Sequence, residues 1–306
     1  MKANISLLGS LALAGLALVG CQKPAEKTAA TTGSAAASTA VTTSTETSSS
    51  MAGKTIRIAT EGTYKPFSIT KADGSLTGFD VDFMQALCAQ MKANCEIKPQ
   101  DWDGLLPGLM AKKYDVVIDA MSITPERQAQ VDFTDPYFTN TLVFLTKQGS
   151  PINPDDPAQI DSHKVAAQRS TLSTQWMEKN HPKAKLNLYE GLDNAFMDLA
   201  AGRSDMMISD KAPAAYWLTT PEGKGFVIKG KEIDVNDKMG IIVRKGDPLR
   251  LEFNKAIATL KSNGTYDKIY NQYFGSATTT IAAASSVVVT VSSTTTTTTT
   301  VASTSK

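Results

Sequence analysis

At 306 residues, with 42% of them hydrophobic, the chain is long enough for one large domain or two medium ones, each with a real core. Its formal net charge of +1 implies no extended basic surface, although a local cationic site stays open. We therefore expect no binding to nucleic acid.

The first 20 residues are typical of a targeting segment. Lys2 gives a positive start, and Ile5 to Gly20 is an apolar run that is too short to span a membrane. The run ends in Leu18-Val19-Gly20-Cys21, which is similar to the bacterial lipobox, whose cysteine is lipidated. We expect a lipoprotein signal peptide over residues 1–20, lipid on Cys21 and attachment to a membrane at the periplasm or cell surface. An ordinary signal peptide with an incidental cysteine is the alternative.

Two low-complexity segments flank the part that can fold. Residues 21–53 are mostly Ala, Thr and Ser, so they cannot repay the entropy of ordering, and we expect a disordered linker. Residues 275–306 are rich in Thr and Ser and are also expected to be disordered, with Val287 to Val291 as an aggregation liability. The folded part therefore spans residues 54–274.

Two of the three cysteines are seven positions apart. Cys88 lies on a predicted helix, and Cys95 enters the next predicted strand. In an oxidising compartment they can form a disulfide, which leaves Cys21 for the lipid. Two reduced thiols are the alternative, but they require a cytosolic protein.

Strands and helices alternate in the first part of the folded segment. Strands are predicted over residues 54–60, 96–99 and 115–121. The first helix opens near Gly78, with Asp80 placed to cap it, and Asp103 can cap a second helix. The first helix has large apolar residues at a spacing of four, namely Phe79, Phe83, Leu87 and Met91.

A short helix after the third strand places one cation at its start. Thr124 fits the N-cap and Pro125 the first helical position, so Arg127 is the third residue of the helix. A cation there opposes the helix dipole by about 0.3 to 1 kcal/mol, so something negative should face it. Either a bound anion or a local acid could do this. The local acids are Glu126, Asp132 and Asp135.

A second alternating set follows. Strands are predicted over residues 164–168, 186–189 and 205–209, and helices over residues 171–180 and 192–201. Alternation of this kind predicts parallel sheets with right-handed crossovers, so two sets suggest two α/β lobes. The chain ends its folded part with a strand over 238–244, a helix over 248–263 and a short helix to Phe274. Leu251, Ala258 and Leu260 are the residues of the 248–263 helix that we expect to face inward.

Polar and aromatic residues follow the predicted strands. In open α/β sheets, ligands bind outside the carboxyl ends of the strands, so we expect these residues to share one cleft. They comprise one cation, three carboxylates, three hydroxyl residues and two aromatics. They are Arg127; Glu61, Asp119 and Asp210; Ser122, Ser170 and Thr171; and Tyr64 and Trp102.

This set has a partner for each part of a zwitterion. Arg127 can hold a carboxylate bidentately, with backbone N–H groups at Ser122 and Thr171 beside it. Asp210 and the Ser122 hydroxyl suit an ammonium group. The two aromatics can flank a side chain, and Glu61 would complement a positive one.

Each of these residues also has a purely structural interpretation. Glu61 could be a solvated loop acid, Trp102 a core anchor, Asp210 a cap for a helix over 211–218, and Thr171 only a cap. Their common position after strands favours the functional interpretation.

Several motifs within residues 54–274 together resemble the polar amino-acid-binding proteins of bacterial ABC importers, the extracellular solute-binding proteins of family 3. The motifs are Thr60-Glu-Gly-Thr-Tyr-Lys-Pro-Phe67, Gly78-Phe-Asp-Val-Asp82, Trp102-Asp-Gly-Leu-Leu-Pro107, Met121-Ser-Ile-Thr-Pro-Glu-Arg127, Asp132-Phe-Thr-Asp-Pro-Tyr137 and Asn263-Gly-Thr-Tyr-Asp267. Within the family, the chain looks closest to the arginine and lysine/arginine/ornithine binders.

The resemblance implies a type II periplasmic-binding-protein fold. Its two lobes, each a mostly parallel sheet flanked by helices, are joined by a hinge of two crossing segments. The implied lobes cover residues 54–140 with 240–274, and residues 141–239. It also implies a non-catalytic monomer without metal or cofactor, which closes on an L-amino acid and presents it to a permease in the inner membrane.

Some positions depart from the basic-amino-acid binders. Asp119 and Ala120 stand where small or hydroxyl residues are common, and both are candidate ligand contacts. Arg169 could make the edge of the second lobe more cationic, and the second hinge segment, 233–239, looks short.

We expect a ligand with a cationic side chain, arginine first, then lysine, ornithine or histidine. A binder of glutamine or glutamate is the nearest alternative, although Glu61 disfavours an anionic side chain. A cyclohexadienyl-dehydratase-like enzyme is less favoured, because the acids would repel its substrate and neither His163 nor His181 is placed for proton transfer. A sensory binding protein that acts through a partner is the remaining alternative.

Overall fold

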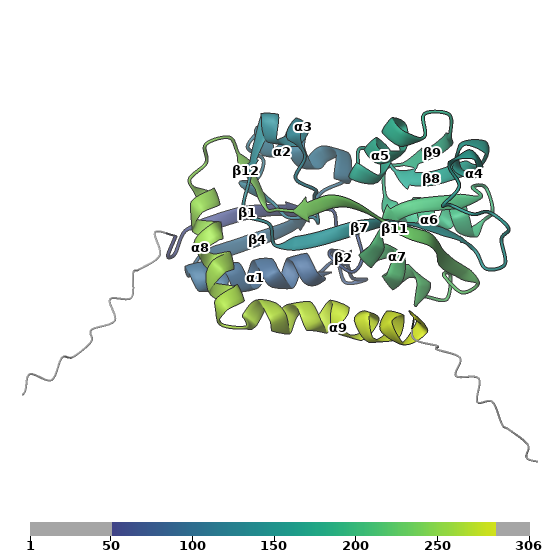
Figure 1. The fold of residues 1–306 in the computed structure, drawn as a ribbon. Helices are drawn as coiled ribbons and strands as arrows, with labels where there is room; N and C mark the ends of the chain where they lie inside the picture. Colours follow the sequence, from purple (N-terminus) through teal and green to yellow (C-terminus); the bar gives the residue numbers. More distant parts are fainter. Residues whose placement is uncertain (1–50, 286–306) are drawn as a thin grey trace, which may run out of the picture. The chain divides into compact units, whose positions relative to one another are not determined.

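The computed structural model describes residues 51–285, and side chains as far as residue 275 (Figure 1). The predicted signal peptide, Cys21, most of the predicted linker and residues 286–306 lie outside the described residues. Lipidation and the state of those two segments therefore stay predictions.

The first of two five-stranded sheets has the strand order β4-β1-β5-β12-β6. We call the elements built on it lobe 1. The pairs β1–β4 and β1–β5 are parallel, whereas β12 runs antiparallel to β5 and β6. The strands are β1 (Thr55–Thr60), β4 (Asn94–Pro99), β5 (Val116–Val117), β6 (Val131–Phe133) and β12 (Ile242–Arg244), with the small hairpin β2 (Ile69–Thr70) and β3 (Leu76–Thr77) beside them. The helices are α1 (Phe79–Met91), η1 (Trp102–Gly104), α2 (Leu105–Met110), α3 (Pro125–Gln130), α8 (Leu249–Ser262) and α9 (Thr265–Ser285).

The second sheet has the order β11-β7-β10-β8-β9, and we call the elements built on it lobe 2. Its pairs β8–β9 and β10–β8 are parallel, and β7 runs antiparallel to β10 and β11. The strands are β7 (Phe138–Lys147), β8 (Lys164–Gln168), β9 (Lys185–Tyr189), β10 (Met206–Asp210) and β11 (Phe226–Met239). The helices are α4 (Pro157–Ser162), α5 (Leu172–Asn180), α6 (Leu192–Ala200) and α7 (Lys211–Leu218).

Each sheet is thus a parallel three-stranded part extended by antiparallel strands. The sequence indicated the parallel parts correctly, but it missed β6, β7 and most of β11. The long strands β7 and β11 lead from one sheet to the other side by side, as Figure 1 shows near the middle of the fold. They carry the chain in opposite directions, so they pair antiparallel to each other. The peptide N–H of Tyr137 donates to the Met239 carbonyl across 3.0 Å and joins the two crossings.

The buried face predicted for α1 is confirmed, whereas the one predicted for α8 is largely wrong. All four apolar residues predicted for the α1 face are buried. In α8, however, Leu251 is 53% exposed and Ala258 is exposed, so only Leu260 of the three predicted residues is buried. The buried face follows a different i, i+3, i+4, i+7 register, made of Phe253, Ala256, Ile257 and Leu260.

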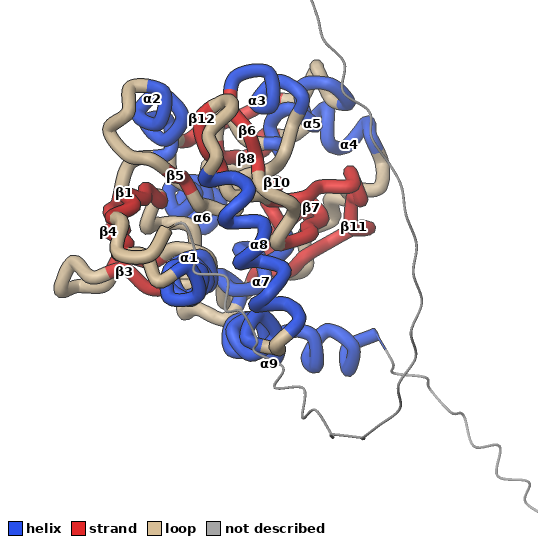
Figure 2. Tube along the Cα trace, turned by 90° about the vertical axis from the view of Figure 1, so that its left-hand side faces the viewer, coloured by secondary structure: helices blue, strands red, loops and turns tan. Residues whose placement is uncertain are grey.

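Helix α9 packs beside α1 and α8 (Figure 2). Its aromatic residues meet the core, with the Phe274 ring 5.1 Å from both Phe79 and Phe138. The helix continues to Ser285, eleven residues past the predicted end at Phe274. Alanines 282–284 favour this continuation, because alanine has the highest helix propensity. For residues 275–285, the structure therefore differs from the predicted disordered tail.

A disulfide joins Cys88 of α1 to Cys95 of β4, with their Cα atoms 6.1 Å apart. The sequence expectation of this pair is confirmed.

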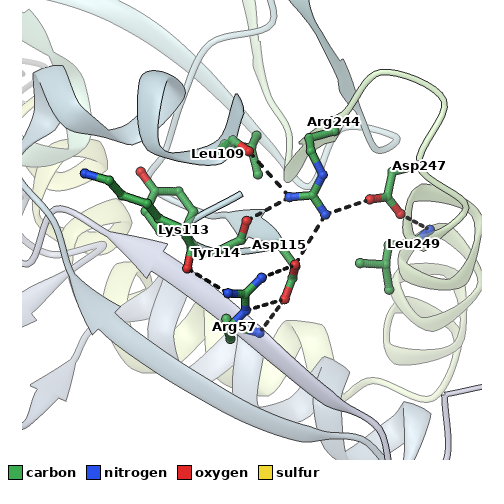
Figure 3. A network of polar contacts seen from close by, with 8 residues as sticks. All are labelled: Arg57, Leu109, Lys113, Tyr114, Asp115, Arg244, Asp247 and Leu249. Atoms are coloured by element: carbon green, nitrogen blue, oxygen red, sulfur yellow. Dashed lines mark hydrogen bonds and ion pairs between the residues drawn. The ribbon is translucent and has the colours of Figure 1, made fainter. Parts of the chain in front are cut away.

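A polar network ties together the strands of lobe 1 at the amino-terminal end of β5 (Figure 3). Asp115 accepts two bonds from the Arg57 side chain, at 2.8 and 3.0 Å, and pairs with Arg244 at 3.3 Å. Arg244 also pairs with Asp247, which accepts the Leu249 N–H at the start of α8. The bond from Arg57 keeps the pKa of Asp115 below its usual range. This network leaves the carboxyl ends of the strands, at the other end of the sheet, for other chemistry.

Candidate functional site

Arg127 lies where the sequence predicts, on the first turn of α3. The Thr124 hydroxyl accepts the Arg127 N–H at 3.3 Å and Pro125 follows it, so the predicted cap is confirmed. The guanidinium is buried and donates to the carbonyls of Ser122 (2.8 Å) and Ser170 (2.9 Å). Ser122 belongs to lobe 1 and Ser170 to lobe 2, so this side chain bridges the lobes.

The local acids do not neutralise Arg127 by direct pairing. Asp132 pairs with Lys245 at 3.0 Å instead, and Glu126 is exposed. Burial lowers the pKa of Arg127 to about 10, opposed by the more distant charges of Asp237 and Asp210. A buried guanidinium held by carbonyls keeps its positive charge available to an anion.

Trp102 begins η1 and lies beneath Arg127, whose guanidinium carbon is 5.5 Å from the ring centroid. Its indole N–H donates to the Arg169 carbonyl of lobe 2 at 3.0 Å. Arg169 itself pairs with Asp103 of lobe 1 and with Glu190. The expectation that Asp103 caps a helix is wrong, because its carboxylate binds this cation from the other lobe and makes no cap bond.

Tyr64 and Asp210 also meet across the lobes, where the tyrosine hydroxyl donates to Asp210 Oδ2 at 2.5 Å. Asp210 precedes α7 but makes no side-chain cap bond, so the helix-cap interpretation is wrong. Burial raises the pKa of Asp210 to about 7, with Asp237 adding to the effect and Tyr64, Asn140 and Arg127 opposing it.

Asp237 and Asn140 were missed by the sequence analysis. They face each other on β11 and β7, with the Asn140 amide donating to Asp237 Oδ2 at 2.9 Å. Within the described part of the chain, Asp237 Oδ1 is buried and accepts no hydrogen bond. Burial raises the pKa of Asp237 as well. The two crossing segments contain several polar residues, which was the only hint in the sequence. Which of these residues face inward depends on how β7 and β11 pair.

Glu61 follows β1 and is 7% exposed, so it is not a solvated loop acid. Its carboxylate accepts from the Thr63 hydroxyl at 2.7 Å and from the Gln168 amide of lobe 2 at 3.2 and 3.4 Å. Burial raises the pKa of Glu61 to about 8, with Asp119 adding to the effect. Gln168, the last residue of β8, was also missed, although it follows the same rule of lying at a strand's carboxyl end.

Asp119 stabilises the loop after β1. Its Oδ1 accepts from Thr60 (2.8 Å), the Glu61 backbone N–H (3.0 Å) and Ser68 (2.9 Å). Its Oδ2 is buried and accepts no hydrogen bond from any residue that the structure describes. Burial raises the pKa of Asp119 to about 6, against these three donors.

Ala120 has a left-handed φ of 44°, and its N–H donates to Asp80 Oδ2 at 2.6 Å. The expectation that Asp80 caps α1 is therefore wrong, because its side chain reaches this backbone instead. Burial raises the pKa of Asp80 to about 8. The Ala120 N–H is therefore already bonded within lobe 1. It is not available to donate to a ligand.

Thr171 caps α5, accepting the Thr174 N–H at 3.3 Å and donating to the Gln168 carbonyl at 2.8 Å. Ser170, just before it, has φ 61°. The left-handed residue turns the chain so that the Ser170 carbonyl can reach Arg127.

The structure thus brings the predicted residues together at the contact between the lobes. Around Arg127, buried carboxyl groups outnumber buried cations in the described part of the chain. These acids are Glu61, Asp80, Asp119, Asp210 and Asp237. A surplus of buried acid is costly unless it is protonated or meets a cation, so the cluster is suited to bind positive groups.

A hollow of about 470 Å³ lies elsewhere, on α6 and α7. Phe196 and Trp217 stack within it at 4.7 Å, and Lys65 pairs with Asp193 at its edge at 2.7 Å. Its lining is mainly apolar, unlike the acidic cluster.

The helices and the His, Cys, Asp and Glu side chains of residues 51–285 bear on whether this part of the chain binds a metal or spans a membrane. These residues contain no cluster of three or more His, Cys, Asp or Glu that could hold a metal ion. No helix among them has both the length and the apolar character needed to cross a membrane.

Comparison with known proteins assigns the chain to a protein family. Residues 56–276 match the family model "Bacterial extracellular solute-binding proteins, family 3", and the chain belongs to this family. It is 37% identical over 231 residues to the L-arginine-binding protein of Pseudomonas aeruginosa, covering 73% of this chain and 89% of the relative.

Solved structures agree on the fold. An ancestral arginine-binding protein bound to arginine has a TM-score of 0.68 and 36% identity, over 72% of this chain and 98% of that one. An ancestral amino acid-binding protein, described as a precursor of cyclohexadienyl dehydratase, has a TM-score of 0.66 and 36% identity, over 72% and 95%. The protein therefore has the type II periplasmic-binding-protein fold and is an amino-acid solute-binding protein of an ABC transporter, as the resemblance implied.

Proposed function

We propose that this protein captures an L-amino acid with a cationic side chain, arginine first, and delivers it to a permease without changing it chemically. The observation that carries this proposal is the buried acidic pair Glu61 and Asp119, 7% and 1% exposed, in which Asp119 accepts the Glu61 backbone N–H; burial raises the pKa of both carboxyl groups. A cationic side chain would favour their ionised forms, whereas the carboxylate of glutamate would be repelled.

Other residues of the cluster would bind the α-carboxylate and the α-ammonium group of the amino acid. Arg127 would hold the α-carboxylate, with backbone groups at Ser122 and Thr171 beside it. Asp210 and the Ser122 hydroxyl would accept from the α-ammonium, and Tyr64 and Trp102 would flank the side chain. Because these residues come from both lobes, the ligand would favour the arrangement in which the lobes meet.

The relatives support this assignment. The L-arginine-binding protein and the ancestral arginine-binding protein carry arginine in their names, at 37% and 36% identity. The dehydratase reaction is disfavoured by the acid surplus, since its substrate brings carboxylates of its own.

Calorimetric titration of the purified protein tests the proposal, with arginine, lysine, ornithine, histidine, glutamine and glutamate as ligands. We expect one-to-one binding of arginine and no binding of glutamate. Binding of glutamine or glutamate alone would refute the cationic pocket, and silence from all six would favour the dehydratase-like alternative.

We further propose attachment to the membrane through lipid on Cys21, in the periplasm or at the cell surface, with the folded body acting as a monomer. A Cys21→Ala protein should then appear in the soluble fraction. Continued association of that variant with membranes would contradict the lipid anchor.

A further inference from the structure

Gln168 presents a buried hydrogen-bond acceptor that nothing in the described structure satisfies. The residue is 2% exposed at the end of β8. Its amide nitrogen donates to the Glu190 carbonyl at 2.8 Å, while its oxygen, Oε1, has no partner. Leaving such an oxygen unpaired costs free energy, so the site needs a donor.

The orientation of this amide is set by its neighbours. The amino group has two sets of acceptors, the Glu190 carbonyl and the Glu61 carboxylate. Turning the amide over would place Oε1 against these oxygens. The amide oxygen is therefore directed away from the Glu190 carbonyl and keeps its free lone pairs.

Glu61 lies between two unsatisfied acceptors. On one side its carboxylate contacts Gln168, and on the other its own N–H donates to Asp119, whose Oδ2 has no partner. The nearby cations are engaged elsewhere, because Lys65 pairs with Asp193 and Arg169 with Asp103. A ligand with several N–H donors could satisfy both acceptors.

Guanidinium and ammonium groups differ in the number and spread of their donors. A guanidinium presents five N–H groups in a plane, whereas a primary ammonium presents three from one atom. We propose that Gln168 selects a guanidinium over a primary ammonium, with Oε1 accepting an N–H that Glu61 cannot reach. This inference rests on the proposed function and specifies the ligand class of the same site.

Gln168 can take this role without losing its own position. Its contacts to Glu61, at 3.2 and 3.4 Å, are longer than its 2.8 Å bond to the Glu190 carbonyl. A guanidinium can replace the longer contacts, while the shorter bond holds the amide. The Gln168 carbonyl is fixed as well, accepting from Thr171 at 2.8 Å and from Thr174 at 2.6 Å.

The test is calorimetric titration of Gln168→Met with arginine and with lysine, at one pH and salt concentration. Methionine has a similar volume and no amide, so we expect arginine affinity to fall about 10-fold, with lysine affinity changed less than about 3-fold. The arginine-to-lysine ratio should fall accordingly. Gln90→Leu on the exposed face of α1 is the control and should leave both affinities unchanged.

A second variant separates selection from positioning. Gln168→Asn keeps the amide but shortens the side chain, so its oxygen withdraws from the ligand, and we expect it to lower the arginine-to-lysine ratio as Gln168→Met does. If either variant weakens arginine and lysine by the same factor, Gln168 only positions the loop and the inference is wrong. If the unmodified protein binds neither ligand, the proposed function fails first, and this inference with it.

Discussion

The Tyr64 hydroxyl of lobe 1 donates to the Asp210 carboxylate of lobe 2 across 2.5 Å, although the two residues are 146 positions apart. This bond can form only when the lobes meet. Tyr64→Phe should therefore disfavour that arrangement and weaken arginine binding about 10-fold, the effect of losing one hydrogen bond to a charged acceptor. Calorimetry measures the change, with Tyr216→Phe on α7 as the matched control. Equal affinity in Tyr64→Phe and the unmodified protein would show that this bond does not support binding.

Arg127→Ala should abolish binding of every α-amino acid, a loss of about 1,000-fold or more, because it removes a buried bidentate donor. Arg250→Ala on α8 is the control for the loss of an arginine. Since Arg127 also bonds to two carbonyls, circular dichroism must show that the variant is folded. A folded variant that still binds arginine with similar affinity would overturn the assignment of the clamp.

Arginine affinity should rise with pH between about 6 and 8, because the ligand cation requires ionised Glu61, whose pKa burial raises to about 8. Below this pKa, binding must release a proton, so the Glu61 contribution is at most about tenfold per pH unit. Asp119 and Asp193 face Glu61 and raise its pKa, whereas Thr63 and Gln168 lower it.

Titration of Glu61→Gln over the same pH range isolates this contribution. The variant should bind arginine more weakly, spare neutral ligands and have a slope shallower by up to one proton. Glu178→Gln on α5 is the exposed control. An identical slope in Glu61→Gln and the unmodified protein would rule out Glu61 as the titrating group.

Two ion pairs connect the lobes near the solvent, Lys65 with Asp193 and Arg169 with Asp103. More than a third of each side chain is exposed, so water and salt screen both pairs and each contributes little to holding the lobes together. The double variant Asp103→Asn/Asp193→Asn should weaken arginine binding about 2- to 10-fold at low salt. In about 0.5 M salt, which screens both pairs, the affinity should hardly change.

Titration at the two salt concentrations checks this, with Asp267→Asn on α9 as the control. A loss of the same size at high salt would mean that the two carboxylates act through packing and not through charge.

Asp80 should make the protein less stable as pH rises from about 4 to 8. Its pKa is raised from 3.8 to about 8 by burial in the folded state, so the folded protein holds the proton more tightly than the unfolded chain. The stability from this group is fully present below the lower pKa and is lost as pH rises to the higher one.

Asp80→Asn removes the titration and should flatten the curve, by at most about 1.4 kcal/mol per pH unit. Urea unfolding at pH 5, 6, 7 and 8 measures it, with Asp101→Asn as an exposed control. Parallel curves for Asp80→Asn and the unmodified protein would contradict the raised pKa.

The sequence by itself determined the local structure and the edge at which the site forms. Residues close together in the sequence determine the Thr124 cap and the buried face of α1, so their spacing predicts both. The alternation of strands with helices likewise predicts the parallel strands. Since parallel strands end at a common edge, the residues that follow them come together.

Only the tertiary structure decided which distant partner each polar side chain takes. Asp80 and Asp103 have the sequence signal of caps, but a backbone N–H and an arginine far along the chain bind them instead. Gln168 and Asp237 likewise join the candidate site only through their hydrogen bonds with Glu61 and Asn140. Burial and the pairing of the two crossing strands set these contacts, and both depend on how segments far apart in the chain pack.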